Sequence, residues 1–390
     1  MSIHNAEPAI LSLATGVPRY GASQEEMLRF FTRAGASSLP ADKRARWGAR
    51  LRNLYASSRI SRRYSVLPDY LADDPQNFEF FPRNWRLDPF PSTAERMRVF
   101  KTASVDLAER VSRQALDEAG VSTKDVTHIV ICTCTGFFAP GPDVELIDRL
   151  GLPSSTQRTI IGFMGCHAGF NGLRVSQQIS QADPDARVLQ VCVELCSLHM
   201  QRGTSEAAAL ANCLFADGCA ALIVGRGSEP SHVLGRLSSF ASLVETSGAD
   251  QMAWDIGDTG FEMRLASQVP DTLRRQIAPF VDSLLYRAGM TIEDVAHWGI
   301  HPGGPRILTA VAEALGLSTD AVDPSSSVLR DYGNMSSPTI FFILQRVFER
   351  AHPGPVVLLG FGPGLTVEGT VLHAVRPQTG HETLVYGKAQ

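Results

Sequence analysis

Residues 119–128 read AGVSTKDVTH and residues 288–297 read AGMTIEDVAH, so five of ten positions are identical at an offset of 169 residues. An amphipathic helix pattern precedes each copy, at 103–119 and at 274–288, and a short apolar strand pattern that ends in glycine follows each. The same offset aligns GFMGCHAGFNGLR with DYGNMSSPTIFFIL, and each reads as a glycine-containing turn that opens a helix. A repeat of this length indicates a duplicated α/β unit.

Apolar strand segments follow both turns. They lie at 187–196 and 216–225 in the first half and at 355–361 and 366–374 in the second. Because helices alternate with apolar strands, we expect two α/β halves packed side by side, each with helices that cover a mostly parallel sheet. Residues 1–235 form the predicted first half and residues 236–390 the second.

Two segments lie outside the duplication. Residues 67–92 hold five prolines and several aromatic residues, and they end in Ser92-x-x-Glu95, the signature of a capping box that opens a helix. Residues 227–262 join the halves and are rich in Gly, Ser and Asp. We expect part of this second segment to fold over a pocket.

The composition is that of an ordinary globular protein. Hydrophobic residues make up 44% and charged residues 19% of 390 residues, and the net charge is -4. A protein with this charge has no general affinity for polyanions, so nucleic acid is not an expected partner. The longest apolar stretches, such as 129–139, are shorter than the roughly 20 residues of a membrane helix, and no membrane partner is expected.

Cysteine usage indicates a reducing compartment. The chain has seven cysteines, and its first residues lack a basic segment followed by an apolar one, so we expect a cytoplasmic protein. Two close pairs, Cys132/Cys134 and Cys192/Cys196, lie in apolar runs typical of buried strands. Such cysteines pack as small hydrophobic residues more often than they bind zinc, and no metal site is predicted.

Cys166 has the features of a nucleophile. Glycines flank it, and the amphipathic run that follows places its sulfur near a helix N-terminus, where free N–H groups favour a thiolate. A buried structural cysteine is the alternative. His301 ends a predicted strand, where α/β sheets place reacting groups, and is the natural imidazole partner, whereas His167 is a weaker rival. Asn334 is either a helix cap or, from its register with Cys166 across the repeat, a catalytic amide.

Together these motifs resemble the type III polyketide synthases, the chalcone and stilbene synthase family of the thiolase fold. The resemblance implies a duplicated α/β fold of αβαβα layers with two mixed, mostly parallel sheets. The resemblance covers about residues 100–375 and rests on four motifs in order: GCHAGFNGLR, GIHPGGPRIL, YGNMSSPT and GFGPGLTVEGTVL. It implies a homodimer that loads an acyl starter from coenzyme A, decarboxylates malonyl-CoA and condenses the two. It assigns Cys166 as nucleophile and acyl carrier, and His301 and Asn334 as the groups that bind the thioester oxygen of malonyl-CoA. No metal or redox cofactor is implied.

The resemblance also assigns a pocket. Phe215 matches a gatekeeper phenylalanine, for which a core aromatic is the alternative, and Met263 stands where the family has a second one. Ala139 replaces a methionine that reaches into the partner's cavity, and Trp254 replaces a glycine and should fill space. The remaining predicted wall positions are Cys134, Thr135, Cys196, His199, Ser336 and the loop Gly360, Phe361, Gly362, Pro363 and Gly364. This loop resembles part of a nucleotide fingerprint, but strand follows it instead of helix.

Residues 43–63 contain eight Lys and Arg and no acidic residue. A cluster of this kind can hold the phosphates of coenzyme A. The resemblance carries over Arg50, with Arg52 and Arg59 as nearby substitutes. A solvated helix face is the alternative.

The predicted reaction is therefore elongation of an acyl-CoA starter with malonyl-CoA, and we favour an aliphatic starter and an α-pyrone or resorcinol-type product. One alternative is a single condensation of the ketoacyl-ACP synthase III kind. A non-catalytic acyl-CoA binding protein on the same fold is another, but it would need none of Cys166, His301 and Asn334.

Overall fold

The computed structural model describes residues 7–227, 233–350, 352–375 and 383–385, and within them the predicted duplication is confirmed. The first half contains α3 (Thr93–Ala119), η3 (Thr123–Asp125) and β4 (His128–Thr133). The second contains α7 (Val269–Arg287), η8 (Ile292–Asp294) and β11 (His297–Ile300), with η8 and β11 each beginning 169 residues after its counterpart. The repeated glycine has a physical reason. Gly120 and Gly289 follow the ends of α3 and α7 with φ 62° and 69°, a left-handed conformation that favours glycine.

A single sheet path runs through both halves in the order β5-β4-β6-β7-β1-β8-β13-β12-β11, so the two predicted sheets are joined edge to edge. The join between β1 and β8 consists of two residue pairs, Ala9 with Arg236 and Ile10 with Gly235. Parallel pairing joins β5, β4 and β6 in one half and β11 and β12 in the other, and the strands between them pair antiparallel, so the sheet is mixed. The bounds are β1 (Pro8–Val17), β5 (Gln157–Gly162), β6 (Arg187–Leu195), β7 (Asp217–Arg226), β8 (Gly235–Val244), β12 (Gly354–Gly362) and β13 (Thr366–Ala374), and β14 (Leu384–Val385) adds to β1.

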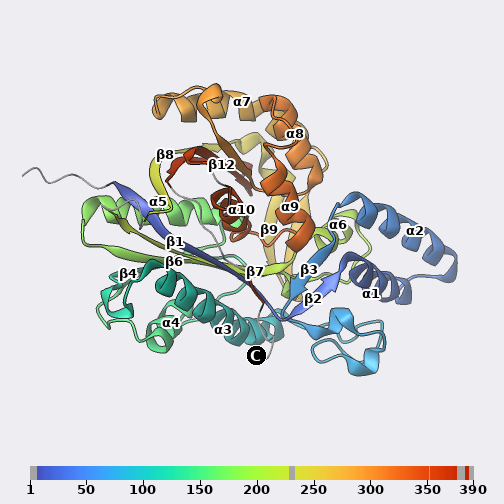
Figure 1. Ribbon diagram of the computed structural model, residues 1–390. Helices are drawn as coiled ribbons and strands as arrows, with labels where there is room; N and C mark the ends of the chain where they lie inside the picture. The colour runs from blue at the N-terminus through green and yellow to red at the C-terminus, as the bar shows by residue number, and fades with distance from the viewer. Residues whose placement is uncertain (1–6, 228–232, 351, 376–382, 386–390) are drawn as a thin grey trace, which may run out of the picture.

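Helices form three layers around the sheet, and the predicted αβαβα arrangement is confirmed (Figure 1). The central layer is α5 (Ala168–Ala182) and α10 (Thr339–Phe348), whose buried cluster includes Phe170, Phe341 and Leu358 from both halves. One outer layer is α3 with α4 (Pro142–Leu150), and the other is α7 with α8 (Pro305–Leu315). α9 (Asp323–Tyr332) leads into α10. The division between the halves at residue 235 stays a prediction.

A third group of elements flanks one end of the layers, at the right of Figure 1. It contains β2 (Tyr20–Ser23), α1 (Gln24–Ser37), α2 (Ala41–Ser57), β3 (Arg62–Ser65) and α6 (Glu206–Leu214). The predicted packed connection is held by the buried carboxylate of Asp69, which accepts hydrogen bonds from the backbone N–H groups of Glu79, Phe80 and Phe81 at 3.2, 3.1 and 2.8 Å. The predicted capping box of Ser92 and Glu95 opens α3.

The predicted pocket-covering segment is also present. It forms η7 (Thr246–Gln251) and a hairpin of β9 (Met252–Gly257) and β10 (Gly260–Leu265). All seven cysteines are buried and unpaired. Among the helices that the structure describes, none is long and apolar enough to cross a membrane.

Candidate active site

Cys166 lies in a 3-10 turn, η4 (Gly165–His167), that runs directly into the N-terminus of α5. The backbone passes through two left-handed residues here, Phe163 at φ 59° and Gly165 at φ 74°. A Cβ at Gly165 would lie 2.6 Å from Cδ of Pro363, so the close approach of the 360–364 loop requires glycine. The glycine before the cysteine therefore serves the turn that presents Cys166.

His301 directly follows β11, as predicted. Its backbone N–H donates to the carbonyl of Leu359 at 2.8 Å and extends the β11–β12 ladder by one residue. The ring is fully buried, and neither Nδ1 nor Nε2 has a hydrogen-bond partner among the described residues. Buried polar atoms are normally satisfied, so two unpartnered nitrogens on one buried ring indicate a group kept free for a ligand.

Asn334 lies in the turn between α9 and α10. Its backbone N–H donates to the carbonyl of Leu214 and its carbonyl accepts from the N–H of Ala216, both at 2.9 Å. Its side-chain Oδ1 accepts from the N–H of Ser336 at 2.8 Å. With the acceptor end engaged, the amide N–H groups are the donors that Asn334 can offer to Cys166 or to a substrate oxygen.

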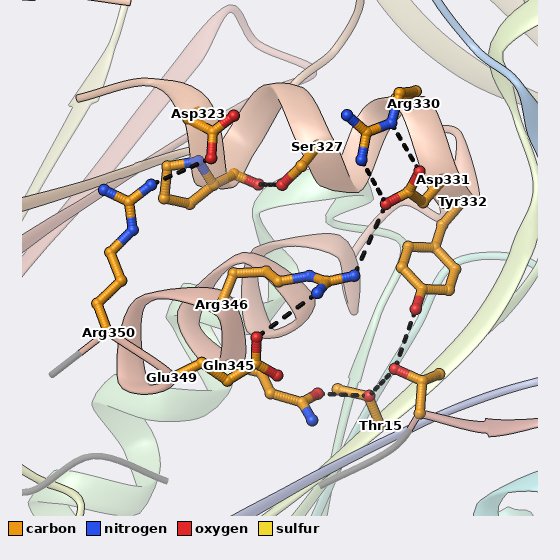
Figure 2. A network of polar contacts seen from close by, with 12 residues as sticks. Thr15, Asp323, Ser327, Arg330, Asp331, Tyr332, Gln345, Arg346, Glu349 and Arg350 are labelled. Atoms are coloured by element: carbon orange, nitrogen blue, oxygen red, sulfur yellow. Dashed lines mark hydrogen bonds and ion pairs between the residues drawn. The ribbon is translucent and has the colours of Figure 1, made fainter. Parts of the chain in front are cut away.

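Polar contacts hold the two helices that flank this turn, as Figure 2 shows. Asp331 at the end of α9 forms an ion pair of 3.7 Å with Arg346 on α10. The hydroxyl of Thr15 on β1 donates to Oε1 of Gln345 on α10 at 2.6 Å. The exposed ion pair contributes little free energy, but the buried hydrogen bond ties α10 to the sheet. The turn carrying Asn334 is thus anchored to the sheet through α10.

The Cys166 thiol is protonated in the free site. Burial raises its pKa to about 11, hydrogen bonds from the side chains of Ser336 and Asn334 act in the opposite direction, and the Glu194 carboxylate raises it further. The sequence predicts a thiolate because of the helix N-terminus, and burial acts against this charged form in the free protein. Burial outweighs the helix terminus when no charged partner lies beside the sulfur.

The imidazole of His301 is neutral in the same site. Burial lowers its pKa to about 3, and the neighbouring His167 acts in the same direction. Among the described residues no hydrogen bond joins Cys166 to His301, because both ring nitrogens are unpartnered. Such contacts often tighten when substrate binds. A neutral imidazole that comes within hydrogen-bond reach of the thiol can take its proton during attack, as a general base.

A buried carboxylate, Glu194 at the end of β6, holds the wall of the site. Its Oε2 accepts hydrogen bonds from the N–H of Cys134 at 2.9 Å and the hydroxyl of Thr135 at 2.7 Å. Its Oε1 accepts from the hydroxyl of Ser337 at 2.7 Å. Thr135 also accepts from the N–H of Leu195 at 2.9 Å and is fully buried, so its hydroxyl serves the wall and is not open to the cavity.

Replacement of Thr135 by valine is therefore expected to lower the free energy of unfolding by about 1–3 kcal/mol, because it leaves one buried carboxylate bond and one N–H unsatisfied. Equilibrium denaturation in urea would measure the change. The matched control is Thr309→Val, whose exposed hydroxyl bonds only to the carbonyl of Pro305 on its own helix, α8, at 3.1 Å. Equal stability of the two variants would show that the Thr135 hydroxyl is not needed by the wall.

A cavity of about 230 Å³ lies beside Phe215. Five of the predicted pocket residues line it: Phe215, Met263, Cys196, His199 and Trp254. Cys166, His301 and Asn334 do not line it. Phe215 faces the cavity, and its backbone forms a bridge with Asn334, so it lies between the cavity and the Asn334 turn. This is the position that a gatekeeper needs.

Trp254 and His199 form one aromatic wall of the cavity with Phe261. The His199 ring stacks on Phe261 with centroids 4.1 Å apart, and Trp254 packs edge-on at 5.6 Å from His199. Trp254 Nε1 donates to the carbonyl of Cys134 at 2.8 Å, and His199 Nδ1 accepts from the N–H of Phe261 at 2.9 Å. Trp254 fills space as predicted. The hydrogen bonds of Trp254 and His199 to the backbone also hold the two rings in place in the cavity wall.

The remaining predicted pocket residues lie nearer to Cys166 or at the surface. Sγ of Cys134 is 3.5 Å from Oγ of Ser336, whose hydroxyl also interacts with Cys166. The predicted 360–364 loop is partly strand: residues 360–362 end β12, and Pro363 and Gly364 lie in the tight turn to β13, the strand predicted to follow. A Cβ at Gly362 would lie 2.2 Å from Nδ1 of His167, so this loop covers the η4 turn. Ala139 is exposed.

The predicted coenzyme A residues are exposed around α2. Arg50 forms an ion pair of 3.4 Å with Glu206 at the start of α6, and Arg52 and Arg59 are exposed. Arg63 differs from the rest of the basic run because it is 2% exposed. The solvated or phosphate-binding face predicted for 43–63 therefore does not include Arg63.

Sequence reasoning missed several residues of the site. Glu194, Phe261 and Arg63 stand in no pattern that marks a functional residue. In the sequence Glu194 reads as an acid at the end of a strand and Phe261 as an aromatic residue of a strand. Arg63 reads as one member of the solvated basic run. Other unpredicted cavity residues include Met27, Phe31, Tyr70 and Met200. In the part of the chain that the structure describes, no three His, Cys, Asp or Glu side chains gather to hold a metal ion.

Comparisons with known proteins cover nearly the whole chain. Residues 2–230 match the family model for the N-terminal domain of chalcone and stilbene synthases, and residues 238–376 match the model for the C-terminal domain. The chain is 33% identical over 379 residues to the alpha-pyrone synthesis polyketide synthase-like Pks18 of Mycobacterium tuberculosis. The aligned region covers 94% of this chain and 91% of that protein. It is 34% identical over 326 residues to the 3,5-dihydroxyphenylacetyl-CoA synthase of Amycolatopsis orientalis, with 82% and 84% covered. The crystal structure of PKS-I from the brown alga Ectocarpus siliculosus superposes with a TM-score of 0.88 at 32% identity, over 96% of this chain and 100% of that chain.

Proposed function

Because the chain belongs to the chalcone and stilbene synthase family, the type III polyketide synthases, we propose that it extends an acyl-CoA starter by decarboxylative condensation with malonyl-CoA. The observation that carries the proposal is the convergence of three chemically matched groups from separate segments. Cys166 opens α5, His301 follows β11, and Asn334 follows α9. The side chain of Asn334 interacts with the Cys166 thiol, and His301 interacts electrostatically with His167, the residue after Cys166.

The first half-reaction loads the starter. Sγ of Cys166 attacks the carbonyl carbon of the acyl-CoA, and the new S–C bond replaces the S–C bond to coenzyme A. His301, neutral in the free site, takes the thiol proton and returns it to the departing coenzyme A sulfur. A buried, neutral imidazole with both nitrogens unpartnered supports this role.

The second half-reaction builds the chain. Loss of CO₂ from malonyl-CoA leaves an electron pair as the thioester enolate, whose oxygen accepts hydrogen bonds from Asn334 and His301. The enolate carbon attacks the acyl group on Cys166, a C–C bond forms, and the S–C bond to Cys166 breaks. The lengthened chain stays on coenzyme A and can be loaded again. No metal or redox cofactor takes part in the proposed reaction.

The proposed starter is aliphatic, and the proposed product is an α-pyrone or a resorcinol-type ring. The cavity beside Phe215 supports the starter class, since Met27, Met200 and Met263 offer flexible apolar surface there. The names of two relatives support the product class, since one is described for alpha-pyrone synthesis and the other for a dihydroxyphenylacetyl-CoA. The free cysteines are compatible with the proposed cytoplasmic location.

Incubation with malonyl-CoA and a panel of aliphatic and aromatic acyl-CoAs, followed by mass spectrometry, tests the proposal. We expect polyketides of two or more extensions, with greater turnover of aliphatic starters. A single extension would indicate a ketoacyl-ACP synthase III type of reaction. If no starter gives product or CO₂, the proposed function is wrong.

A homodimer is also proposed, through the sheet edge at β5. This strand pairs with β4 on one side, and Ile160 is 44% exposed on it. Phe137 and Met164, 41% and 39% exposed, lie in the segments next to β4 and β5. An exposed strand edge with apolar side chains is an open site for pairing, and a second copy of the same edge is self-complementary.

Ile160→Glu is accordingly expected to convert a dimer into a monomer, because it places charges opposite each other at the proposed interface. Sedimentation velocity would measure the change. Tyr286→Glu, at an 83% exposed position on α7, is the control and should sediment like the wild type. A dimeric Ile160→Glu protein would place the interface elsewhere, and a monomeric wild type would end the dimer proposal.

A further inference from the structure

Arg63 is a buried arginine that donates hydrogen bonds to neutral groups. It lies on β3 and is 2% exposed. Its Nε donates to Oε1 of Gln24 at 2.9 Å, and its Nη1 donates to the carbonyls of Asn212 at 2.7 Å and Phe215 at 2.8 Å. Burying a guanidinium costs free energy, so a role that uses its several donors is expected.

The carbonyls that Arg63 binds belong to the end of α6 and the residue after it. The last carbonyls of a helix have no partner within the helix, and a cation there also suits the helix dipole. Here the carbonyls of residues 212–215 all accept a hydrogen bond. Arg63 Nη1 donates to the carbonyls of Asn212 and Phe215. Nε2 of Gln24 donates to the carbonyl of Cys213 at 3.0 Å, and the N–H of Asn334 donates to the carbonyl of Leu214 at 2.9 Å.

The same guanidinium side chain also backs the Asn334 turn. Gly333 has φ 74°, and a Cβ there would lie 2.8 Å from Cγ of Arg63, so the turn packs directly on the arginine stem. Phe215 and Asn334 are bridged to each other through their backbones. Arg63 therefore donates a hydrogen bond to one partner of this bridge, Phe215, and packs against Gly333, the residue before the other partner.

We propose that Arg63 is a positioning residue that sets the gatekeeper Phe215 and the amide of Asn334 in register with each other. The inference rests on the proposed function. Asn334 acts on malonyl-CoA and Phe215 borders the cavity, whereas starter loading needs Cys166 and His301. Displacing the bridge should therefore slow condensation much more than loading.

Arg63→Lys is the informative variant, because it keeps the charge but lacks the planar group that donates from Nη1 to both carbonyls and from Nε to Gln24 at the same time. We expect condensation to fall about 10- to 100-fold, the scale of a misplacement of about 1 Å in an active site. The rate at which starter alone loads Cys166, measured by intact-protein mass spectrometry, should stay within about threefold of the wild-type rate, because the displaced groups act in condensation and not in loading. Arg63→Met, which removes all donors, should show the larger loss of condensation.

The control is Arg287→Met, which removes an exposed arginine from the last turn of α7 and should leave both steps unchanged. If Arg63→Met does not fold, Arg63→Lys still decides the question. Equal loss of loading and condensation would indicate a merely structural role and overturn the inference. Unchanged condensation in Arg63→Lys would also overturn it. A wild type that loads starter but never condenses would instead contradict the proposed function.

Discussion

A protein in which Cys166 is replaced by alanine is expected to form no acyl adduct and no polyketide. Cys166 is the proposed sulfur nucleophile, and burial also raises the pKa values of the nearby Cys134 and Cys196 thiols well above their ordinary range. Neither of them directly precedes an α-helix, as Cys166 does before α5, so neither is expected to replace it. Removal of a nucleophile typically lowers turnover by about 10³-fold or more. Mass spectrometry of the intact protein after incubation with an acyl-CoA would detect the adduct, and product analysis would measure turnover.

The change should leave the fold intact. Cys166 is 8% exposed, and alanine removes one sulfur atom from the turn without changing its backbone. Cys219→Ala, a fully buried cysteine on β7, is the matched control and should keep both loading and product formation. Full activity in Cys166→Ala would overturn the mechanism. Inactivity in both variants would mean that loss of a buried thiol, and not loss of the nucleophile, causes the defect.

The second large effect is expected for His301→Ala. Loss of a general base or acid usually costs about 10²- to 10⁴-fold. Because His301 is proposed to act in both half-reactions, loading of the starter and condensation should both fall, which distinguishes the expected effect from that of replacing Arg63. Single-turnover loading measured by quenched mass spectrometry, together with steady-state product formation, would separate the two steps.

Two further measurements test His301. Added imidazole should restore part of the loading rate, because alanine leaves a space where the ring was. His128→Gln, at the position equivalent to His297 in the repeat, should be as active as the wild type, because His128 bonds only to the neighbouring Thr127 hydroxyl at 2.8 Å. Retention of loading in His301→Ala to within tenfold would assign the proton transfer to another group, of which His167 is the nearest candidate.

The residues that sequence reasoning located share one property, a strong local pattern. The 169-residue repeat, the glycine after each helix and the capping box of Ser92 follow from periodicity and from backbone conformations that few residues adopt. Cys166, His301 and Asn334 stand at turns that interrupt such patterns. Their positions at the ends of elements are therefore readable from the chain alone, while their catalytic roles stay predictions.

The residues whose roles the sequence does not predict have hydrogen-bond partners in distant segments of the chain. Thr135 faces Glu194, which lies 59 residues away, and this hides its hydroxyl from the cavity. Arg63 belongs to a basic run in the sequence, yet the carbonyl that it binds on Phe215 is 152 residues away. Only the packing of β3 against α6 and the Asn334 turn decides that one arginine of the run is buried while Arg62 beside it is exposed.

The amino-acid sequence by itself determined the duplicated α/β fold, the family and the three groups at the centre of the site, because these depend on short-range periodicity and on turns that demand particular residues. The tertiary structure decided the resting protonation of Cys166 and His301, because their pKa values are set by burial. It also decided which polar residues build the wall and which face the cavity. Burial and long-range hydrogen bonds exist only after the chain has folded, so no pattern along the chain can carry them.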